Sequence, residues 1–396
     1  MKDIQELIVE IASELIKVPG HNEVAEYEYN TALKLAEILR INGVDCETPE
    51  ADSGRLNVVA KINGGGGPSL LLTTHLDTIP PGTIQDAYQP MVCDGRLYGR
   101  GAVDVKGVLA SMAAVMIHLK RHSITPPGDV IFAGVAGEES GSVGMRALIA
   151  SDELKPDLAV IGEPTELEVA VAHNGILWME IEFFGKATHG SRPENGINAV
   201  YKANDFLCLL REELLPKLAE RRHPLTGSST LNVGVIEGGT RPTVVPANCL
   251  VQFDRRFIPG ETRESALEEL NELLEKLSKN DPDFKHEMRI LLGDVGMSLP
   301  PLEAKSDDPM IKAVCEITAD VLKKQVVPKG MPCWTDAALA NAVWKVPSVI
   351  IGPGDVAQAH ADDEYVELTQ LYDSYKLYLE LALSIGKGEK AAYETL

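Results

Sequence analysis

The sequence is short of several features that mark particular classes of protein. Its six cysteines are scattered over 396 residues without a Cys-x-x-Cys pair, so a thiolate metal cluster is not indicated. Basic residues number 37 against 59 acidic ones, and the net charge of −22 opposes binding to nucleic acid or to an anionic membrane surface. No apolar run approaches the ~20 residues of a membrane span, and no signal peptide is recognisable. We therefore expect a cytoplasmic protein with reduced thiols.

Familiar catalytic and nucleotide-binding motifs are also missing. There is no G-x-S-x-G segment, so a serine hydrolase of that type has no nucleophile here. The glycine run 64–67 lacks the G-K-[ST] ending of a phosphate-binding loop. In "GRGAVDVKG" (99–107), Asp104 takes the place of the third glycine of a dinucleotide-binding loop, where a carboxylate would repel pyrophosphate.

Short apolar segments alternate with amphipathic ones in the first part of the chain, which is typical of an α/β domain with a mainly parallel sheet. The expected helices are one with apolar positions from residue 4 to 16 that ends at Pro19-Gly20, one at about 23–42 and one at 105–122. The expected strands are 56–62, 70–74, 130–136 and 158–161.

The pattern changes near residue 174 to the order βαββαβ, which favours a small ferredoxin-like α+β sheet with both helices on one face. An alternation of helix and strand then returns. The sequence thus predicts a discontinuous catalytic domain (1–174 and 293–396) interrupted by an inserted domain (175–292). The expected elements are strands 176–184, 230–236, 249–257 and 287–292 with helices 196–214 and 263–278, followed by helix 309–322, strand 348–351 and helix 368–383.

Residues that bind metals or move protons follow four of the apolar strands. Ligands gather at the carboxyl ends of strands in an open α/β sheet, so we expect these side chains to meet there. Any one of them has an ordinary explanation, such as a surface histidine or a solvated acidic turn, but four strand ends together are harder to dismiss. They are His75 and Asp77 after 70–74, Glu138 and Glu139 after 130–136, Glu163 after 158–161, and His360 after 348–351.

With Asp104, the set offers two imidazoles and three carboxylates as ligands, which suit zinc, cobalt or manganese. Two such metals, ~3.5–4 Å apart and bridged by one carboxylate, could activate a water molecule. The sequence therefore predicts a metal site.

The chain resembles a family of dinuclear zinc amidohydrolases that includes deacetylases, desuccinylases, aminoacylases and carboxypeptidases. The resemblance covers nearly the whole chain and implies a zinc-exopeptidase-like catalytic domain with an inserted dimerisation or lid domain. The motifs that carry it, in this order, are "HLD" (75–77), "GRGAVDVKG" (99–107), "GEES" (137–140), "IGEPT" (161–165), "THGSRP" (188–193), "DRRFIPGET" (254–262) and "AHADDEY" (359–365).

The resemblance implies a ligand set for two divalent metal ions, zinc first, with cobalt or manganese as alternatives. His75, Asp104 and Glu163 would hold one metal, and Asp104, Glu139 and His360 the other, with Asp104 as the bridge. It also implies a cis peptide bond between Asp104 and Val105.

The same resemblance implies roles for five further residues. Glu138 would be the general base, and Asp77 would orient His75. His189 would help to hold the oxyanion and would reach the active site of a partner subunit, so a homodimer through the inserted domain is expected. Arg256 would bind a substrate carboxylate, although pairing with Asp254 is an alternative. Thr243 stands where the family often has asparagine, and a hydroxyl cannot replace both amide protons.

The expected reaction is hydrolysis of the amide bond of a small N-acyl amino acid, with N-acetyl favoured by the segment 352–365. A desuccinylase or a dipeptidase or carboxypeptidase is the alternative within the family. A metal-free binding protein on the same fold is the alternative of another class, and the complete ligand set argues against it.

Overall fold

The computed structural model describes residues 3–151, 154–291 and 299–386. Its contacts divide the chain into two compact units. The first comprises Met1–Val171, Glu303–Met331 and Thr335–Leu396, and the second comprises Ala172–Leu302 with Pro332–Trp334. The boundary expected at 292/293 falls in 292–298, which lies outside the described residues.

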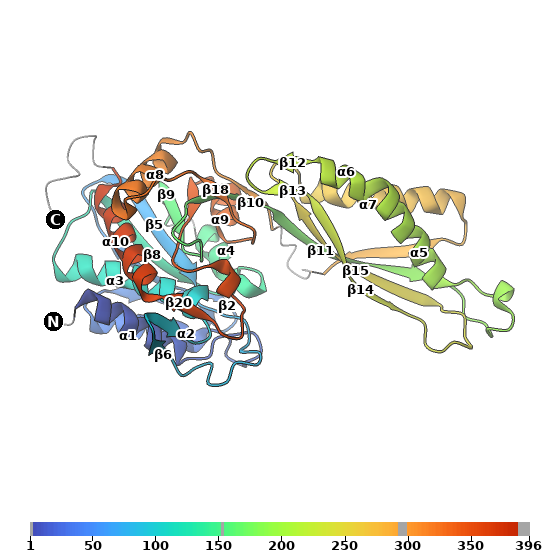
Figure 1. Cartoon of the computed structure of the whole chain (residues 1–396), viewed down its shortest axis with the longest axis horizontal. Coiled ribbons are helices and arrows are strands. Elements are labelled where there is room, and N and C mark those ends of the chain that lie inside the picture. Colours follow the sequence, from blue (N-terminus) through green and yellow to red (C-terminus); the bar gives the residue numbers. More distant parts are fainter. Residues whose placement is uncertain (1–2, 152–153, 292–298, 387–396) are drawn as a thin grey trace. The chain divides into compact units, whose positions relative to one another are not determined.

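The first unit contains a nine-stranded sheet (Figure 1). Its main path runs β1-β4-β8-β5-β9-β19-β10-β17, and β18 pairs with β10. Strands β8, β5, β9 and β19 are parallel to their neighbours within this group, whereas β1, β4 and β10 pair antiparallel. The strands are β1 (Cys46–Glu47), β4 (Val58–Ile62), β5 (Gly67–His75), β8 (Gly128–Val135), β9 (Leu158–Ile161), β10 (Ala170–His173), β17 (Leu302–Glu303), β18 (Lys329–Gly330) and β19 (Ser348–Ile350).

The four parallel strands are buried because helices and loops cover both of their faces, which explains their apolar runs. Their register aligns the carboxyl ends, since His75 pairs with Val135, and Ile161 pairs with both Thr73 and Ile350. The predicted parallel α/β core is therefore confirmed, and it places the residues after these strands at one edge.

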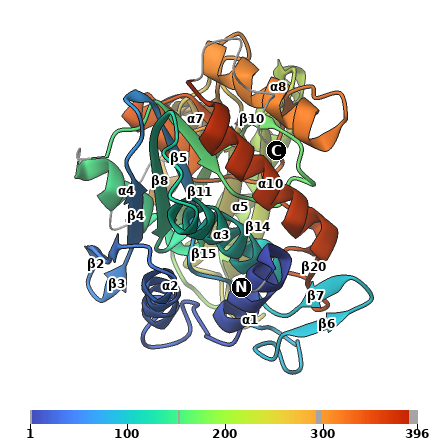
Figure 2. The same cartoon turned by 90° about the vertical axis from the view of Figure 1, so that its left-hand side faces the viewer.

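Helices α1, α3 and α10 pack against one another in front of the sheet (Figure 2), and α3 also packs on β4, β5 and β8. Elsewhere α4 packs on β8, and α9 packs on β9 and β19. The helices of this unit are α1 (Ile4–Ile16), α2 (Tyr29–Ile41), α3 (Gly107–Arg121), α4 (Val143–Ala150), α8 (Pro309–Leu322), α9 (Ala337–Leu339) and α10 (Leu368–Ser384), with short non-α turns η1 (Ala102–Lys106), η2 (Glu138–Ser140), η5 (Ala340–Trp344) and η6 (Val356–Gln358).

One helical stretch corrects the expectation that no apolar run approaches a membrane span. The 20 residues Ala102–Arg121 are long and apolar enough to cross a membrane by length and composition. However, 94% of the most apolar part is buried inside the structure, as is usual for a core helix.

The second unit is built on an antiparallel sheet in the order β14-β15-β11-β16. Numbered along the chain, this is the 4-1-3-2 order of a ferredoxin-like sheet read from its other edge, as the βαββαβ pattern predicts. One face of the sheet packs on α5 and α7 through a core that includes Phe183, Phe206 and Phe253. The elements are β11 (Gly175–Phe184), η3 (Pro193–Asn195), α5 (Ala199–Leu209), η4 (Leu210–Leu214), α6 (Leu215–Glu220), β12 (Arg222–His223), β13 (Gly227–Ser228), β14 (Thr230–Gly238), β15 (Asn248–Phe257), α7 (Arg263–Asn280) and β16 (Lys285–Ile290).

Two expected helices begin later than predicted. The helix expected from about residue 23 begins at Tyr29, because Tyr27 has a φ of +48°, which an α-helix does not allow. The helix expected from 105 becomes regular only at Gly107, because Asp104 and Val105 have non-helical backbone angles.

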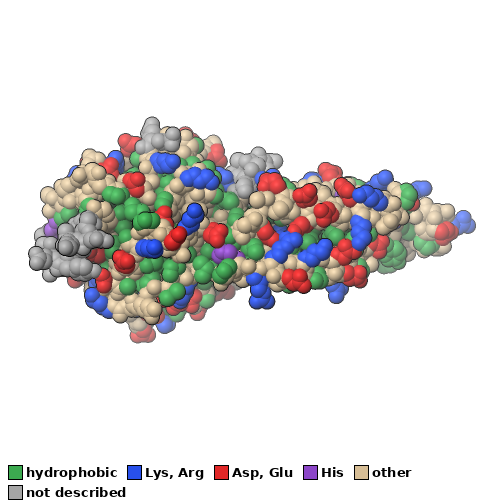
Figure 3. All heavy atoms as spheres, turned by 90° about the horizontal axis from the view of Figure 1, so that it is seen from above, with side chains coloured by type: hydrophobic (Ala, Val, Ile, Leu, Met, Phe, Trp, Pro, Cys, Tyr) green, Lys and Arg blue, Asp and Glu red, His purple; other side chains and the backbone are tan. Residues whose placement is uncertain are grey.

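Several short strands escaped prediction because they lack a clear apolar period. They form a hairpin, β2 (Glu50–Asp52) with β3 (Arg55–Leu56), and a three-stranded sheet of β6 (Met91–Cys93), β7 (Arg96–Tyr98) and β20 (Tyr365–Glu367). On the surface, acidic and basic side chains are interspersed over the face seen in Figure 3.

Candidate metal centre

The predicted ligands of the first unit meet at the carboxyl edge of the parallel strands. His75 ends β5 and is buried. Its Nε2 lies 3.1 Å from Asp104 Oδ1 and 3.8 Å from Glu163 Oε1. These three residues are the set predicted for one metal, and the structure brings them together.

The set predicted for a second metal also converges. His360 Nε2 lies 3.0 Å from Glu139 Oε1 and 3.3 Å from Asp104 Oδ2. The two oxygens of Asp104 therefore face two different histidines, Oδ1 toward His75 and Oδ2 toward His360. A carboxylate placed in this way is suited to bridge two cations.

The donor set fits divalent metal ions. Ligand atoms of His75, Asp104 and Glu139 lie within 4.8 Å of one another, and the imidazole and carboxylate donors are those that zinc and related metals prefer. The five predicted ligands bring three carboxylates together at one place, where a cation would relieve their mutual repulsion.

The pKa shifts reflect this crowding in the metal-free protein. Burial raises the pKa of Glu163 well above its ordinary value, with Asp104 and Glu139 adding to the rise. Hydrogen bonds to Asp104 and Glu139 raise the pKa of His360 to about 10. Burial would lower the pKa of His75, but hydrogen bonds to Asp104 and Asp77 raise it well above its ordinary value. Such a cluster holds protons where a bound metal would displace them.

A tight turn after β8 places Glu138 and Glu139 side by side. Asp77 accepts hydrogen bonds from both of their backbone amides, Glu138 N at 3.1 Å and Glu139 N at 3.2 Å. Asp77 was predicted to orient His75. Its carboxylate lies 3.4 Å from His75 Nδ1, but its backbone carbonyl is closer, at 2.9 Å. Asp77 thus ties the end of β5 to the glutamate turn as well as to the imidazole.

The buried ion pair of Arg55 and Glu28 contacts the same turn. Arg55 donates to both carboxylate oxygens of Glu28, at 2.8 and 2.7 Å, and to Ser140 Oγ at 3.0 Å. The guanidinium also packs against Gly137, where a Cβ would come within 2.6 Å of Arg55 Nη2 and where φ is +72°. Glycine is therefore required at the residue that precedes Glu138.

The loop that carries Asp104 is organised by Glu364, which is buried. Glu364 accepts hydrogen bonds from Arg100 Nη1 (2.6 Å) and from the backbone amides of Gly101, Val103 and Asp104 (3.0, 3.0 and 3.2 Å). The Asp104–Val105 peptide bond is cis, as predicted.

The loops after β9 and β19 interlock, which brings Glu163 close to the segment before His360. Thr165 Oγ1 accepts from Gly352 N at 3.1 Å, and Leu167 N donates to Gly352 O at 2.9 Å. His360 has a φ of +64°, an uncommon backbone conformation for a non-glycine residue that tends to occur at functional sites.

Three predicted site residues lie in the second unit. His189 is exposed, and its Nδ1 lies 2.7 Å from Ser191 Oγ. Its loop runs beside that of Thr243, because Gly190 N donates to Thr243 O at 2.8 Å. Arg256 Nε donates to Asp254 at 2.9 Å, which is the alternative that its sequence position left open. Their roles in binding or catalysis stay predictions.

Two residues near the centre were missed as site residues. Glu364 stands in the motif "AHADDEY" (359–365), but its role depends on contacts with residues about 260 positions away. Asp336 is buried, and burial raises its pKa to about 6. Its Oδ1 has no hydrogen-bond partner among the described residues. The segment "CWTDAALA" (333–340) is the sequence signal that could have singled it out.

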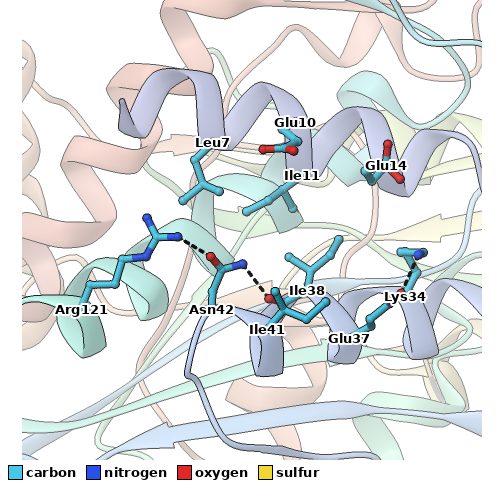
Figure 4. Close-up of a pocket in the computed structure, with 10 residues that line it drawn as sticks. All are labelled: Leu7, Glu10, Ile11, Glu14, Lys34, Glu37, Ile38, Ile41, Asn42 and Arg121. Atoms are coloured by element: carbon cyan, nitrogen blue, oxygen red, sulfur yellow. Dashed lines mark hydrogen bonds and ion pairs between the residues drawn. The ribbon is translucent and has the colours of Figure 1, made fainter. Parts of the chain in front are cut away.

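A groove of about 690 Å³ lies away from these residues, between α1 and α2 (Figure 4). Leu7, Ile11, Ile38 and Ile41 line it together with charged side chains. None of the predicted site residues lines it, and we assign it no role.

The sequence profile described as Peptidase family M20/M25/M40 matches residues 71–384. Among curated proteins, the chain is 30% identical over 339 residues to an acetylornithine deacetylase of Aliivibrio fischeri (strain MJ11), covering 84% of this chain and 85% of that one. It is 29% identical over 396 residues to an acetylornithine deacetylase of Proteus mirabilis, covering 97% and 98%.

Solved structures with the same fold include an M20 family metallo-carboxypeptidase of Sulfolobus solfataricus, with a TM-score of 0.79, 20% identity and coverage of 97% of this chain and 99% of that one. A Bacillus subtilis protein described as a dinuclear metal binding peptidase from the M20 family has a TM-score of 0.72 at 18% identity, covering 97% and 98%.

Proposed function

Since this chain belongs to peptidase family M20/M25/M40, we propose that it hydrolyses the amide bond of a small N-acyl amino acid, with an acetyl group as the acyl group. The observation that carries the proposal is the placement of Asp104 between two histidines, with Oδ1 facing His75 and Oδ2 facing His360. The acetyl group is supported by the deacetylase relatives at about 30% identity.

In this proposal His75, Asp104 and Glu163 would hold one divalent metal ion, and Asp104, Glu139 and His360 would hold a second, with zinc as the first choice and cobalt or manganese as alternatives. Bound metals of this kind lower the pKa of water to about 7 and polarise a carbonyl group. The residues that surround them supply the remaining chemistry.

Glu138 acts as the general base. Its backbone amide is held by Asp77, so its side chain starts from a fixed point beside Glu139, and it is not itself one of the proposed ligands. Glu138 takes the proton from the attacking water and returns it to the nitrogen of the departing amine. The products are then a carboxylic acid and a free amino acid.

Substrate recognition falls to the second unit. The guanidinium of Arg256 is steadied by Asp254 through Nε, which leaves the Nη atoms to bind the carboxylate of the substrate. Thr243 offers one hydroxyl in the loop beside His189, so it makes a smaller contact there than an asparagine would.

His189 helps to hold the oxyanion and comes from the partner in a homodimer. An edge strand supports pairing of two copies, because β14 lies at the end of the small sheet with Ile236 56% and Val235 36% exposed. Such an edge can add a strand from a second chain.

A substrate panel tests the proposal. Metal-free protein is supplied with zinc, cobalt or manganese and assayed with N-acetyl amino acids, N-succinyl amino acids and dipeptides. We expect the N-acetyl compounds to have the highest kcat/KM. Preference for N-succinyl compounds or dipeptides would replace the acetyl assignment, and no hydrolysis with any metal would refute the enzyme assignment.

A further inference from the structure

A second group of metal-binding side chains lies at the far end of α3. His118 lies in the last turn of α3 and His122 is the residue that caps this helix, and their ring centroids are 4.5 Å apart. The stretch from Gly107, next to the metal centre, to His122 corresponds to ~22 Å of α-helix. The pair is therefore separate from the centre described above.

The two histidines line a cavity of about 260 Å³ together with Asp3 and Tyr375. The walls come from α3, from the start of α1 and from α10, three elements that pack against one another. The cavity thus offers two imidazoles and one carboxylate from two different segments of the chain.

The ring of His118 is held in one orientation. Tyr375 Oη lies 2.8 Å from His118 Nδ1, so Nε2 is the nitrogen left for a ligand. A partner on the second ring nitrogen is the usual arrangement for a histidine that binds a metal. Burial and the neighbouring His122 lower the pKa of His118, which favours the neutral imidazole that a metal needs.

Asp3 and Arg121 define the charge around the cavity. Asp3 precedes α1 and its side chain makes no capping hydrogen bond to that helix. It is exposed and lines the same cavity as the two histidines. Arg121 also lines the cavity, but its guanidinium donates to Asn42 Oδ1 in the groove between α1 and α2 (Figure 4). The Arg121 side chain is thus directed toward that groove.

We propose that His118 and His122, with Asp3 as a third ligand, form an additional binding site for a divalent transition metal such as zinc, nickel or copper. Two histidines at i and i+4 on a helix form a known chelating pair for zinc, and imidazole suits all three metals. The bound ion connects the beginning of α1 to the end of α3. It stabilises the fold and takes no part in catalysis, so the site does not depend on the proposed reaction.

Counting bound zinc tests the proposal. Metal-free protein is dialysed to equilibrium against excess Zn²⁺, and the bound metal is measured for the wild type and for the double variant His118→Gln/His122→Gln. We expect the double variant to bind one equivalent less than the wild type and to keep the wild-type kcat. His286→Gln, which changes a histidine of the second unit, is the matched control and should bind as much zinc as the wild type.

Two further variants distinguish metal binding from an electrostatic effect of side chains at the C-terminus of α3. His122→Lys places a positive charge near the helix C-terminus, where it is favourable, but should also lose the equivalent of zinc. Tyr375→Phe keeps both imidazoles and should weaken the affinity for this zinc by about 10–100-fold. This variant also decides the matter if the double variant does not fold. Equal zinc in the wild type and the double variant, or unchanged zinc affinity in Tyr375→Phe, overturns the proposal.

Discussion

The candidate residues of the two units differ in how firmly the structure holds them. In the first unit, His75 and Asp77 are buried, and Asp104 and the glutamate turn are fixed by Glu364, Asp77 and Arg55. In the second unit, His189 is exposed, and its ring lies against Ser191, which is only two residues away. The first unit therefore holds its candidate residues by buried contacts, whereas the side chain of His189 is held by a short exposed contact within its own loop.

The largest effect tests the centre itself. Removing metal with a chelator should abolish turnover, because the proposed nucleophile is a water molecule activated by the metals. The sequence predicts no side chain that could attack the substrate in its place. Adding zinc or cobalt back should restore it. The measurement is kcat for a cleaved substrate of the panel, together with metal analysis of the same sample. Full activity in protein shown to be metal-free would contradict the mechanism.

The next largest loss of activity distinguishes the roles of Glu138 and Glu139, two neighbours in the same turn. Glu138→Gln should lower kcat by about 10²–10⁴-fold, because the amide cannot take the proton of water, and should leave the bound metal unchanged. Glu139→Gln is the matched variant and should lose or weaken one metal instead. Metal analysis and kcat are measured for both. The reverse pattern would exchange the two assignments.

A smaller effect tests the second unit. His189→Ala should lower kcat by about 10²–10³-fold, as the loss of an oxyanion donor does, with both metals still bound. Mixing this variant with Glu138→Gln and allowing the subunits to exchange should restore part of the activity. A mixed dimer would contain one site with an intact Glu138 and an intact His189 from the neighbour.

Exchange of subunits must be shown independently, for example by mixing two differently tagged proteins. If exchange occurs and no activity returns, the histidine acts within its own chain or not at all. A stable monomer with full activity would refute the shared site.

The contrast between the units also explains what the sequence could predict. The meeting of His75, Glu138 and Glu163 at one edge could be predicted, because each follows an apolar strand and parallel strands place such residues at the same edge of a sheet. The sequence could not predict that Glu364 organises the Asp104 loop, since its partners are amides and an arginine about 260 positions earlier. It also could not place Asp77 against two backbone amides, which depends on the path of the turn after β8.

The smallest effect on activity is expected from the buried pair of Glu28 and Arg55, which contacts the turn that carries Glu138 and Glu139. Glu28→Ala should destabilise the protein by ~3–5 kcal/mol in free energy of unfolding, because Arg55 is left with a buried and unpaired charge. The side chains of Arg55 and Glu28 are only 8% and 0% exposed. The measurement is urea unfolding followed by circular dichroism. Activity below the unfolding transition should fall less than in Glu138→Gln, because the reacting groups are retained.

The control for this prediction lies in the second unit. Glu275 pairs with Lys279 at 3.1 Å, but the two side chains are 69% and 74% exposed, and solvent screens such a pair. Glu275→Ala should therefore leave the urea midpoint nearly unchanged. If the two substitutions lowered the free energy of unfolding equally, the buried Glu28–Arg55 pair would stabilise the protein no more than an exposed pair does. A large loss for Glu28→Ala alone, accompanied by a lower kcat, would link this buried pair to the position of Glu138 through Ser140 and Gly137, the residues of the turn that Arg55 contacts.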